Sequence, residues 1–417
     1  MDRDFSEIFH FIARISNSHS LHHRPSFVDP PTHSVIFVQC SAQNSCRDSG
    51  RFRSIADGLV TASIPLLALS HPFAVRTFLH LSSPEIKTTI SYGKHPSQII
   101  DFFQPATNLL STPRRSIFFV HGGAWGRCER MSYHVPGVSR KCNPGVSPSF
   151  VLLSVFVSGY PWMYRLVAKP FLEQGWAVAI IGYRTYPDGK ASEQMTDCRA
   201  ALHQLRKTYP EWMCRHKGGR CTLMGHSSGA HISLLMLVED AENMMKKSKE
   251  GGDILPETLP FDSFVGLSGP FDISHHFDYE AARGVEELSP MKPTCGMTRD
   301  GFRHFSPAPR LQKALACFPE DDRLLLTSRV FPRLLLVHGI EDETVPFTAT
   351  AEAAKIIRAC GVLSCEETYV AKTGHQETVM QIMLGGRTRT TVVGWIKHLS
   401  KNLQPSSSVG LVGDSKL

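Results

Sequence analysis

The chain has 417 residues, of which 42% are hydrophobic and 20% are charged. These proportions are typical of a globular protein with a sizeable core, in one large domain or two ordinary ones. The net charge of +7 is modest, much of the Arg and His excess lies in residues 1–55, and no basic stripe is interleaved with aromatic residues, so we expect no nucleic acid as a partner.

The first 87 residues differ in pattern from the rest of the chain. Residues 1–55 are rich in His, Ser, Arg and Pro without a sustained hydrophobic period, which predicts a disordered N-terminal extension. Residues 56–87 have mixed helical spacing, which predicts a covering helix. The acidic start of the chain is unlike a secretory signal. The apolar stretch 58–75 is interrupted by Pro65 and Pro72, so we expect no integral membrane span there.

Two short strand patterns and a glycine loop come next. Strands are predicted at 88–90 and 98–103, and Asp101 interrupts the second, as an outer strand of a sheet would permit. Residues 115–120 predict a buried strand that ends in His121-Gly-Gly-Ala-Trp125. Glycines at this point allow the backbone to turn its N–H groups toward a substrate oxygen. A plain glycine loop is the alternative.

Residues 127–157 interrupt this pattern. Their deletion would join Trp-Gly126 smoothly to Ser158-Gly-Tyr, where a helical cover pattern resumes. We interpret them as an insertion beside the glycine loop, either a lid or a disordered stretch. The last nine of these residues, 149–157, are apolar but too short to span a membrane.

The segment 221–231 joins an apolar strand to an amphipathic helix that runs to about residue 247. Its Gly225-x-Ser227-x-Gly229 spacing is typical of a sharp turn between strand and helix, in which a side chain at either glycine would collide with backbone. Ser227 is expected at the tip of the turn, in a strained conformation with its hydroxyl clear of the sheet. The positive end of the helix dipole would then face a developing oxyanion. A surface loop is the alternative interpretation of the motif alone.

Strand and helix patterns alternate over the remainder of the chain. The predicted strands are 176–183, 264–269, 333–339 and 366–371, and the predicted helices are 192–209, 348–359, 376–384 and 389–403. Residues 270–328 have a mixed pattern and are expected to form helices over the active site. We therefore predict a doubly wound α/β domain over 88–403, with a mainly parallel sheet, helices on both faces and a small helical cover.

The tail and the cysteines indicate a cellular location. Residues 404–417 look flexible and end in Ser415-Lys416-Leu417, and a terminal Ser-Lys-Leu is the peroxisomal import address. The 11 cysteines show no Cys-x-x-Cys pair or metal-like spacing, and the chain has no Asn-x-Ser/Thr acceptor; both features favour a reducing compartment and free, mostly buried thiols. We expect a peroxisomal protein with the import receptor as a partner; a cytoplasmic location is the alternative.

A serine hydroxyl is a poor nucleophile at neutral pH, so it needs an imidazole to take its proton and a carboxylate to orient that imidazole. In a doubly wound sheet these partners come from loops after later strands, at the edge where the serine lies. Asp342 follows the strand 333–339, and His375 follows the last predicted strand. The order Ser227, Asp342, His375 therefore predicts the three catalytic residues.

The sequence contains alternatives to both Asp342 and His375. Glu341 and Glu343 flank Asp342 and are alternatives to it, or all three could form a solvated acidic turn. His338 and His398 are the alternatives to His375. His338 lies too early in the chain for the base, and His398 lies within the final predicted helix.

Together these motifs resemble the α/β-hydrolase fold and, within it, the His-Gly-Gly carboxylesterase group. The turn Tyr183-Arg-Thr-Tyr-Pro187 is similar to that of prenylcysteine methylesterases and kynurenine-formamidase-like esterases. The resemblance covers about 88–400 and implies Ser227 as nucleophile, His375 as base and then acid, and Asp342 as its orienter. It also implies a site lined by loop residues: an oxyanion hole of Gly122, Gly123, Ala124 and Ser228, and a pocket that includes Trp125 and His226.

The resemblance further implies a serine hydrolase that cleaves a small-molecule carboxylic ester through an acyl-enzyme, without metal or cofactor. The enzyme alternatives are an arylformamidase, an acyl thioesterase and a prenylcysteine methylesterase. A non-catalytic binding member of the fold is the alternative outside enzymes, but such proteins usually lose a catalytic residue. The segment 127–157 departs from the family pattern beside the oxyanion loop, so its displacement of that loop would lower turnover.

Overall fold

The computed structural model describes residues 80–81, 86–106, 113–126, 160–249, 261–287, 289–362 and 364–401. All of them fall within one compact unit of the chain, Asp48–Leu417. The predicted extension 1–55, most of the predicted helix 56–87, the segment 127–157 and the tail 404–417 lie outside the described residues. Among the residues described, no helix combines the length and apolar character needed to cross a membrane.

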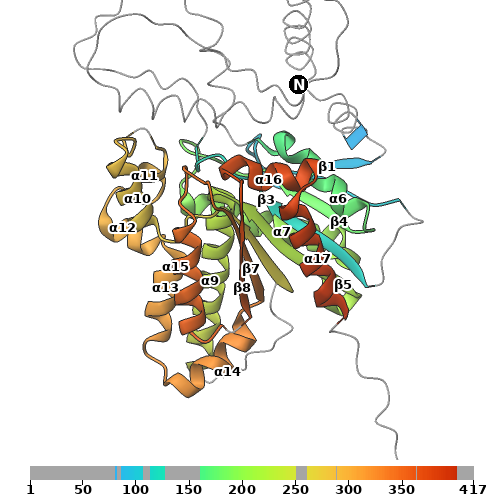
Figure 1. Ribbon diagram of the computed structural model, residues 1–417. Helices are drawn as coiled ribbons and strands as arrows, with labels where there is room; N and C mark the ends of the chain where they lie inside the picture. The colour runs from blue at the N-terminus through green and yellow to red at the C-terminus, as the bar shows by residue number, and fades with distance from the viewer. Residues whose placement is uncertain are drawn as a thin grey trace, which may run out of the picture. The chain divides into compact units, whose positions relative to one another are not determined.

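The described strands form one sheet of eight (Figure 1) in the order β1-β2-β4-β3-β5-β6-β7-β8. They are β1 (Lys87–Ser91), β2 (Ile99–Phe103), β3 (Arg114–Val120), β4 (Ala177–Ile181), β5 (Gly219–His226), β6 (Ser263–Leu267), β7 (Arg333–Gly339) and β8 (Cys365–Val370). β2 is antiparallel to both of its neighbours, β1 and β4, and all other pairs are parallel. The predicted mainly parallel sheet is confirmed.

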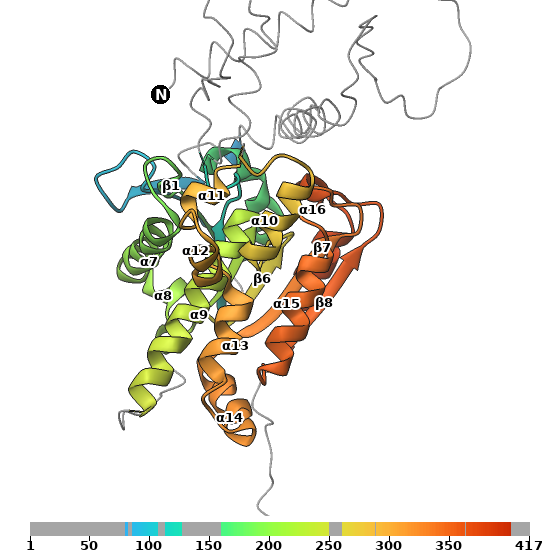
Figure 2. The same cartoon turned by 90° about the vertical axis from the view of Figure 1, so that its left-hand side faces the viewer.

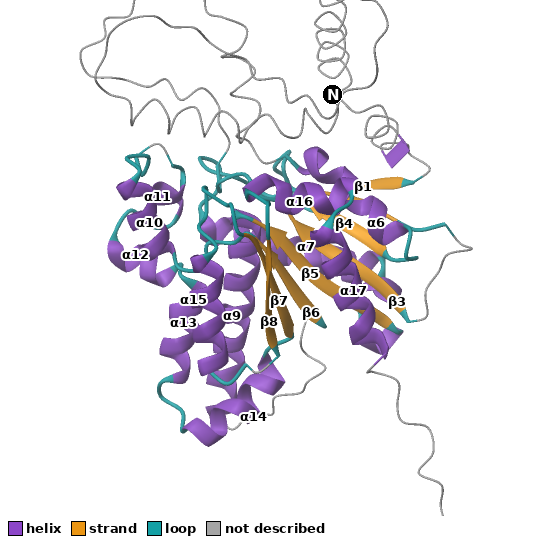
Figure 3. Cartoon of the chain, in the orientation of Figure 1, coloured by secondary structure: helices purple, strands orange, loops and turns teal. Residues whose placement is uncertain are grey.

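Helices cover both faces of this sheet, since each parallel connection must cross over and bury an apolar stripe. One face carries η2 (Pro161–Val167), α6 (Ala168–Leu172), α16 (His375–Leu384) and α17 (Arg387–Lys401). The other carries α7 (Ala191–Thr208), α8 (Pro210–Met213), α9 (Ser228–Lys249), α13 (Pro307–Leu315) and α15 (Thr348–Ala359), which stand in front of the sheet in Figure 2. The short η3 (Arg215–Lys217) precedes β5. Figure 3 shows the strands enclosed between these layers.

The central strands are buried on both faces, which explains their continuous apolar runs. Every residue of β4 and β6 is buried, and so is every residue of β7 after Arg333. The described cysteines are free, and all but Cys317 are buried in or near this core, as the sequence indicated.

Only part of the predicted cover, 270–328, lies over the carboxyl ends of the parallel strands. There stand α10 (Ile273–Ala282), α11 (Met291–Thr294) and α12 (Arg299–His304). α13 packs along the sheet face beside α9 and α15, and α14 (Glu320–Val330) lies at the opposite end of the strands (Figure 1). The prediction was wrong for α14, because this helix leads directly into β7 and must therefore lie near that strand's amino end.

Asp101 also differs from expectation, because β2 is not the outer strand and this side chain is only 1% exposed. Its carboxylate accepts hydrogen bonds from Arg165 Nε at 2.8 Å, Lys87 Nζ at 3.1 Å and Thr89 Oγ1 at 2.8 Å. Burial alone would raise the pKa of Asp101, but the charge and hydrogen bond of Arg165 outweigh it and lower the pKa. This apolar strand can contain a buried carboxylate because the charge of Asp101 is paired.

Candidate active site

The order of the strands reverses between β3 and β5, since the chain leaves β3 toward β4 on one side and leaves β5 toward β6 on the other. In open α/β sheets such a reversal opens a crevice at the carboxyl ends of the two strands. Here those ends are followed by the glycine loop that starts at His121 and by the turn at Ser227. The fold therefore brings the two predicted motifs to one place.

Ser227 stands in a strained turn between β5 and α9, with a φ of 54°. Residues other than glycine rarely adopt this left-handed backbone conformation, and such strain persists only where the surrounding structure holds it. A Cβ on Gly225 would lie 2.5 Å from the carbonyl oxygen of Gly229, and one on Gly229 would overlap the carbonyl oxygen of Val120. The Ser227 N–H donates to Leu267 O of β6 at 2.8 Å. Neither glycine can therefore be replaced without moving backbone.

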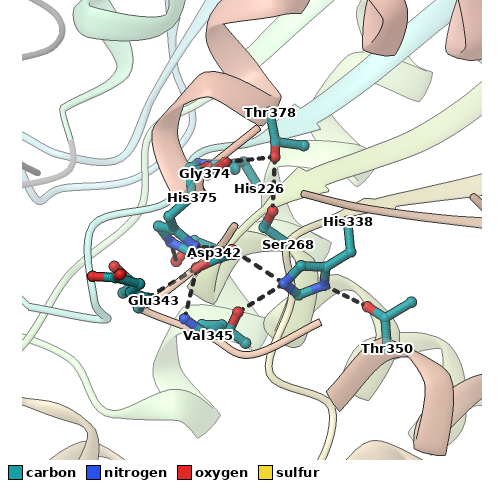
Figure 4. A network of polar contacts seen from close by, with 12 residues as sticks. His226, Ser268, His338, Asp342, Glu343, Val345, Thr350, Gly374, His375 and Thr378 are labelled. Atoms are coloured by element: carbon teal, nitrogen blue, oxygen red, sulfur yellow. Dashed lines mark hydrogen bonds and ion pairs between the residues drawn. The ribbon is translucent and has the colours of Figure 1, made fainter. Parts of the chain in front are cut away.

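The structure brings the side chains of Ser227, Asp342 and His375 together. Ser227 Oγ lies 2.9 Å from His375 Nε2, and His375 Nδ1 lies 2.7 Å from Asp342 Oδ2 (Figure 4). Ser227 is 9% exposed, and the other two are 6% exposed. The imidazole thus stands between a hydroxyl on one nitrogen and a carboxylate on the other, the arrangement in which a serine proton can pass to Nε2.

The carboxylate of Asp342 is buried, whereas its neighbours Glu341 and Glu343 are exposed. Its Oδ1 accepts the backbone N–H groups of Thr344 at 3.0 Å and Val345 at 2.8 Å. Burial would raise the pKa of Asp342, but the charge of His375 and the hydrogen bonds from the neighbouring imidazoles outweigh it and hold the pKa well below its usual range. Asp342 is therefore ionised and fixed in direction.

The two alternative histidines occupy different places. His398 is exposed on α17. His338 is fully buried, and its Nε2 lies 3.1 Å from Asp342 Oδ2, on the same carboxylate oxygen that His375 contacts. Its position before Asp342 in the chain pointed away from the base role, but nothing in the sequence indicated this contact.

Three further polar side chains hold the start of α16, which carries His375. His226 Nε2 donates to the carbonyl oxygen of His375 at 3.1 Å. Ser268, with a φ of 48°, donates from Oγ to Thr378 Oγ1 at 3.1 Å, and Thr378 donates to the carbonyl oxygen of Gly374 at 3.0 Å (Figure 4). Sequence reasoning missed Ser268 and Thr378, because each contacts a partner from a different strand or turn.

The loop after β3 has positive φ at three successive residues, 135° at Gly123, 51° at Ala124 and 60° at Trp125; the last two carry side chains and are strained. A Cβ on Gly122 would lie 3.1 Å from Ser227 Cβ, so the loop passes directly beside the serine. Gly122 makes a backbone hydrogen bond to the buried phenol of Tyr164, whose pKa burial raises. Within the described part of the chain, the N–H groups of Gly123 and Ala124 donate to no acceptor.

Trp125 anchors this loop. Its indole N–H donates to His231 Nδ1 of α9 at 3.0 Å, and His231 Nε2 donates to Phe305 O of the cover at 2.7 Å. The Trp125 carbonyl oxygen accepts the Tyr186 N–H and the Gln194 side-chain amide, both at 2.8 Å. Three contacts from three segments therefore hold a backbone conformation that costs about 1–3 kcal/mol per strained residue.

His226 does not take the expected place in a pocket wall. Its side chain is fully buried beneath His375, and the two rings are 5.1 Å apart. Burial, and to a lesser degree the charge of His375, lower the pKa of His226 to about 3, so it is a neutral donor to the backbone of His375. Trp125 is 3% exposed, and its role as a pocket wall stays a prediction.

In the described residues, no group of three or more His, Cys, Asp or Glu side chains is arranged to hold a metal ion.

Comparison with solved structures identifies the architecture. The crystal structure of esterase B from Lactobacillus rhamnosis superposes with a TM-score of 0.54 at 15% sequence identity, covering 85% of this chain and 95% of that one. This chain has the α/β-hydrolase fold. The protein-family model BD-FAE matches residues 160–356 of this chain, a span that contains Ser227 and Asp342 but neither the glycine loop nor His375.

Two plant proteins are similar in sequence to this chain. A probable isoprenylcysteine alpha-carbonyl methylesterase of Oryza sativa subsp. japonica is 28% identical over 264 residues, which cover 62% of this chain and 58% of that protein. Another, of Arabidopsis thaliana, is 24% identical over 315 residues, which cover 74% of this chain and 55% of that protein. The chain thus spans less than two thirds of the length of these relatives. The expected resemblance to prenylcysteine methylesterases is confirmed.

Proposed function

We propose that this chain is a serine hydrolase that cleaves a carboxylic ester through an acyl-enzyme intermediate. The observation that carries the proposal is the 2.9 Å contact between Ser227 Oγ and His375 Nε2, with Asp342 2.7 Å behind the other ring nitrogen. Similarity to proteins named esterases supports it.

In the proposed reaction, His375 Nε2 takes the Ser227 hydroxyl proton as Oγ attacks the ester carbonyl carbon. The tetrahedral intermediate collapses, the bond to the alcohol oxygen breaks, and that oxygen receives the proton from His375. Water then attacks the acyl-Ser227 carbonyl, gives a proton to His375, and Oγ leaves with that proton. The products are a carboxylic acid and an alcohol, and Asp342 stabilises the imidazolium that forms in each half.

The negative oxygen of each tetrahedral intermediate needs N–H donors that are fixed in advance. We assign this role to Gly123, Ala124 and Ser228. Gly123 and Ala124 have N–H groups without acceptors among the described residues, and they directly follow Gly122, which lies beside Ser227. Ser228 is the first residue of α9, so its N–H has no acceptor within the helix. Gly122 contributes less in this proposal, because its backbone contacts Tyr164.

Methyl esters of prenylated cysteine are the first substrates to examine, because the plant relatives carry names of that activity. A panel should also include p-nitrophenyl esters of short acids, N-formylkynurenine and an acyl-CoA, which represent the carboxylesterase, arylformamidase and thioesterase alternatives.

The test is a comparison of the protein with its Ser227→Ala variant on this panel, together with labelling by a fluorophosphonate probe. We expect ester hydrolysis and covalent labelling that the variant loses, with a fall in rate of at least about 10³-fold. A Ser227→Ala protein that retains full esterase activity would contradict the mechanism. A protein that binds a panel ester without labelling or turnover would favour the non-catalytic alternative.

A separate proposal concerns location and rests on Ser415-Lys416-Leu417 alone. We propose that this sequence directs import into peroxisomes through the import receptor. Attachment of residues 404–417 to the C-terminus of a fluorescent protein tests it, and a diffuse cytoplasmic signal would contradict it.

A further inference from the structure

A second imidazole, that of His338, lies beside the Asp342 carboxylate, at the same oxygen that His375 contacts. His338 lies near the end of β7, its side chain is fully buried, and its ring has three polar neighbours (Figure 4). Nε2 lies 2.8 Å from the carbonyl oxygen of Val345 and 3.1 Å from Asp342 Oδ2, and Nδ1 lies 2.7 Å from Thr350 Oγ1. These contacts come from the loop after β7 and from α15.

The neighbours determine where the proton of His338 resides. Both atoms near Nε2 are acceptors, since one is a carbonyl oxygen and the other a carboxylate oxygen, so Nε2 must carry a hydrogen. In the neutral ring, Nδ1 then accepts the hydroxyl hydrogen of Thr350. This arrangement satisfies every polar atom of a buried neutral imidazole in a single tautomer, which the two acceptors beside Nε2 fix.

The same contacts complete the hydrogen bonding of Asp342. Oδ2 accepts the N–H of His375 and lies 3.1 Å from His338 Nε2, whose N–H also donates to Val345 O at 2.8 Å. Oδ1 accepts the backbone N–H groups of Thr344 and Val345. A carboxylate with three hydrogen bonds and a fourth N–H at 3.1 Å is held in one plane and one direction. It is also a weaker acceptor for any one donor, because its negative charge is shared among them.

We propose that His338 is a positioning residue of the active site: it aims the Asp342 carboxylate at His375 and moderates how strongly that carboxylate attracts the His375 proton. The inference rests on the proposed esterase function. The hydrolase motifs of the sequence do not require it, because an acid, a base and a nucleophile are complete without a fourth side chain.

The main test compares His338→Met, which removes the donor at similar volume, with His338→Gln, whose amide nitrogen can reach the position of Nε2. Ile340→Met, exposed on the same loop, is the matched control. On the best ester of the panel we expect His338→Met to lower kcat about tenfold with little change in KM. His338→Gln should recover most of this loss, and the control should match the unchanged protein.

The pH profile separates positioning from simple loss of folded protein. His375 must be neutral to take the Ser227 proton, so kcat/KM rises with pH along its acid limb. Without His338, Asp342 attracts the His375 proton more strongly, and the acid limb should move to higher pH by about 0.5–1 unit, the size of one hydrogen bond. The other titratable groups that face this cluster, His226 and Tyr279, are unchanged in both variants. An unshifted limb or an unchanged kcat in His338→Met would overturn the proposal.

A second measurement uses the unchanged protein, so it does not depend on how a variant folds. In ¹⁵N-histidine NMR spectra at pH 7.5, His338 should show the Nε2–H tautomer. A protonated ring or an Nδ1–H tautomer would overturn the inference. If no panel ester is hydrolysed, the proposed function fails, whereas this spectroscopic result still reports on His338 by itself.

Discussion

Asp342 and its two acidic neighbours carry the same charge, and burial is what distinguishes them. Glu341 and Glu343 are exposed, so water solvates their charges. Asp342 is 6% exposed and exchanges water for two backbone N–H groups and two imidazoles. At the scale of a single residue, the loop after β7 therefore determines which of the three carboxylates points inward and contacts His375.

We expect Asp342→Asn to lower kcat by about 10⁴-fold, because an amide cannot stabilise the His375 imidazolium and favours the wrong tautomer of the ring. Glu341→Gln and Glu343→Gln are matched controls that remove the same charge from the same turn, and both should stay within about twofold of the unchanged protein. Steady-state kinetics on the best panel ester, with a thermal melt of each variant, measures this. A larger loss in either glutamate variant would assign the acid to that residue.

At the scale of elements, the turn between β5 and α9 is the segment in which sequence most directly determines structure. Gly225 and Gly229 leave no room for a side chain, and their spacing, together with the flanking strand and helix patterns, predicted the turn and Ser227. The alternation of strands and helices likewise predicted the parallel sheet, because buried parallel strands read as continuous apolar runs.

Other features depend on contacts between distant segments, and the sequence could not predict them. Thr378 and Ser268 are 110 positions apart in the chain but share a hydrogen bond, and His338 reaches Asp342 only because the loop after β7 folds back. The place of α14 followed from the direction of β7 rather than from its own composition. Local patterns thus predicted the candidate catalytic residues Ser227, Asp342 and His375, and tertiary packing brings in the residues that support them.

We expect Gly229→Ala to destabilise the protein by about 2–3 kcal/mol or more, because the added Cβ overlaps the carbonyl oxygens of Val120 and His121 and forces backbone to move. Gly394→Ala is the matched control, because an added Cβ there has no atom within 4 Å and lies inside α17. It should stabilise the protein by about 0.5–1 kcal/mol. Urea unfolding measures both, and equal effects would contradict the tight packing of the turn.

For the whole molecule, buried neutral histidines at the active-site end of the fold make the free energy of unfolding depend on pH. Burial lowers the pKa of His121 to about 4, of His226 to about 3 and of His231 to about 4. Each ring supports a segment of the site: His121 begins the glycine loop, His226 lies beneath His375, and His231 holds Trp125. In the unfolded chain the same side chains titrate near 6.5.

The sign of the effect follows from these values. Below about pH 6.5 the unfolded chain binds protons that the folded protein excludes until about pH 4, so acid favours unfolding. Each histidine should lower the free energy of unfolding by about 1.4 kcal/mol per pH unit in this window. Stability lost through protonation of paired carboxylates such as Asp342 comes only below about pH 4, so the histidines dominate the window above it.

We therefore expect the free energy of unfolding to fall steeply between pH 6.5 and pH 5, and to be nearly constant from pH 7 to pH 8. Urea unfolding at half-unit steps measures the slope. His231→Gln should lower stability at neutral pH, because Trp125 and Phe305 lose a partner. Between pH 6.5 and pH 5 it should also make the free energy of unfolding less dependent on pH, because about one proton fewer is taken up on unfolding. Gly394→Ala should shift stability by the same amount at every pH and leave the slope unchanged. A His231→Gln slope equal to that of the unchanged protein would mean that this ring is already protonated in the folded state.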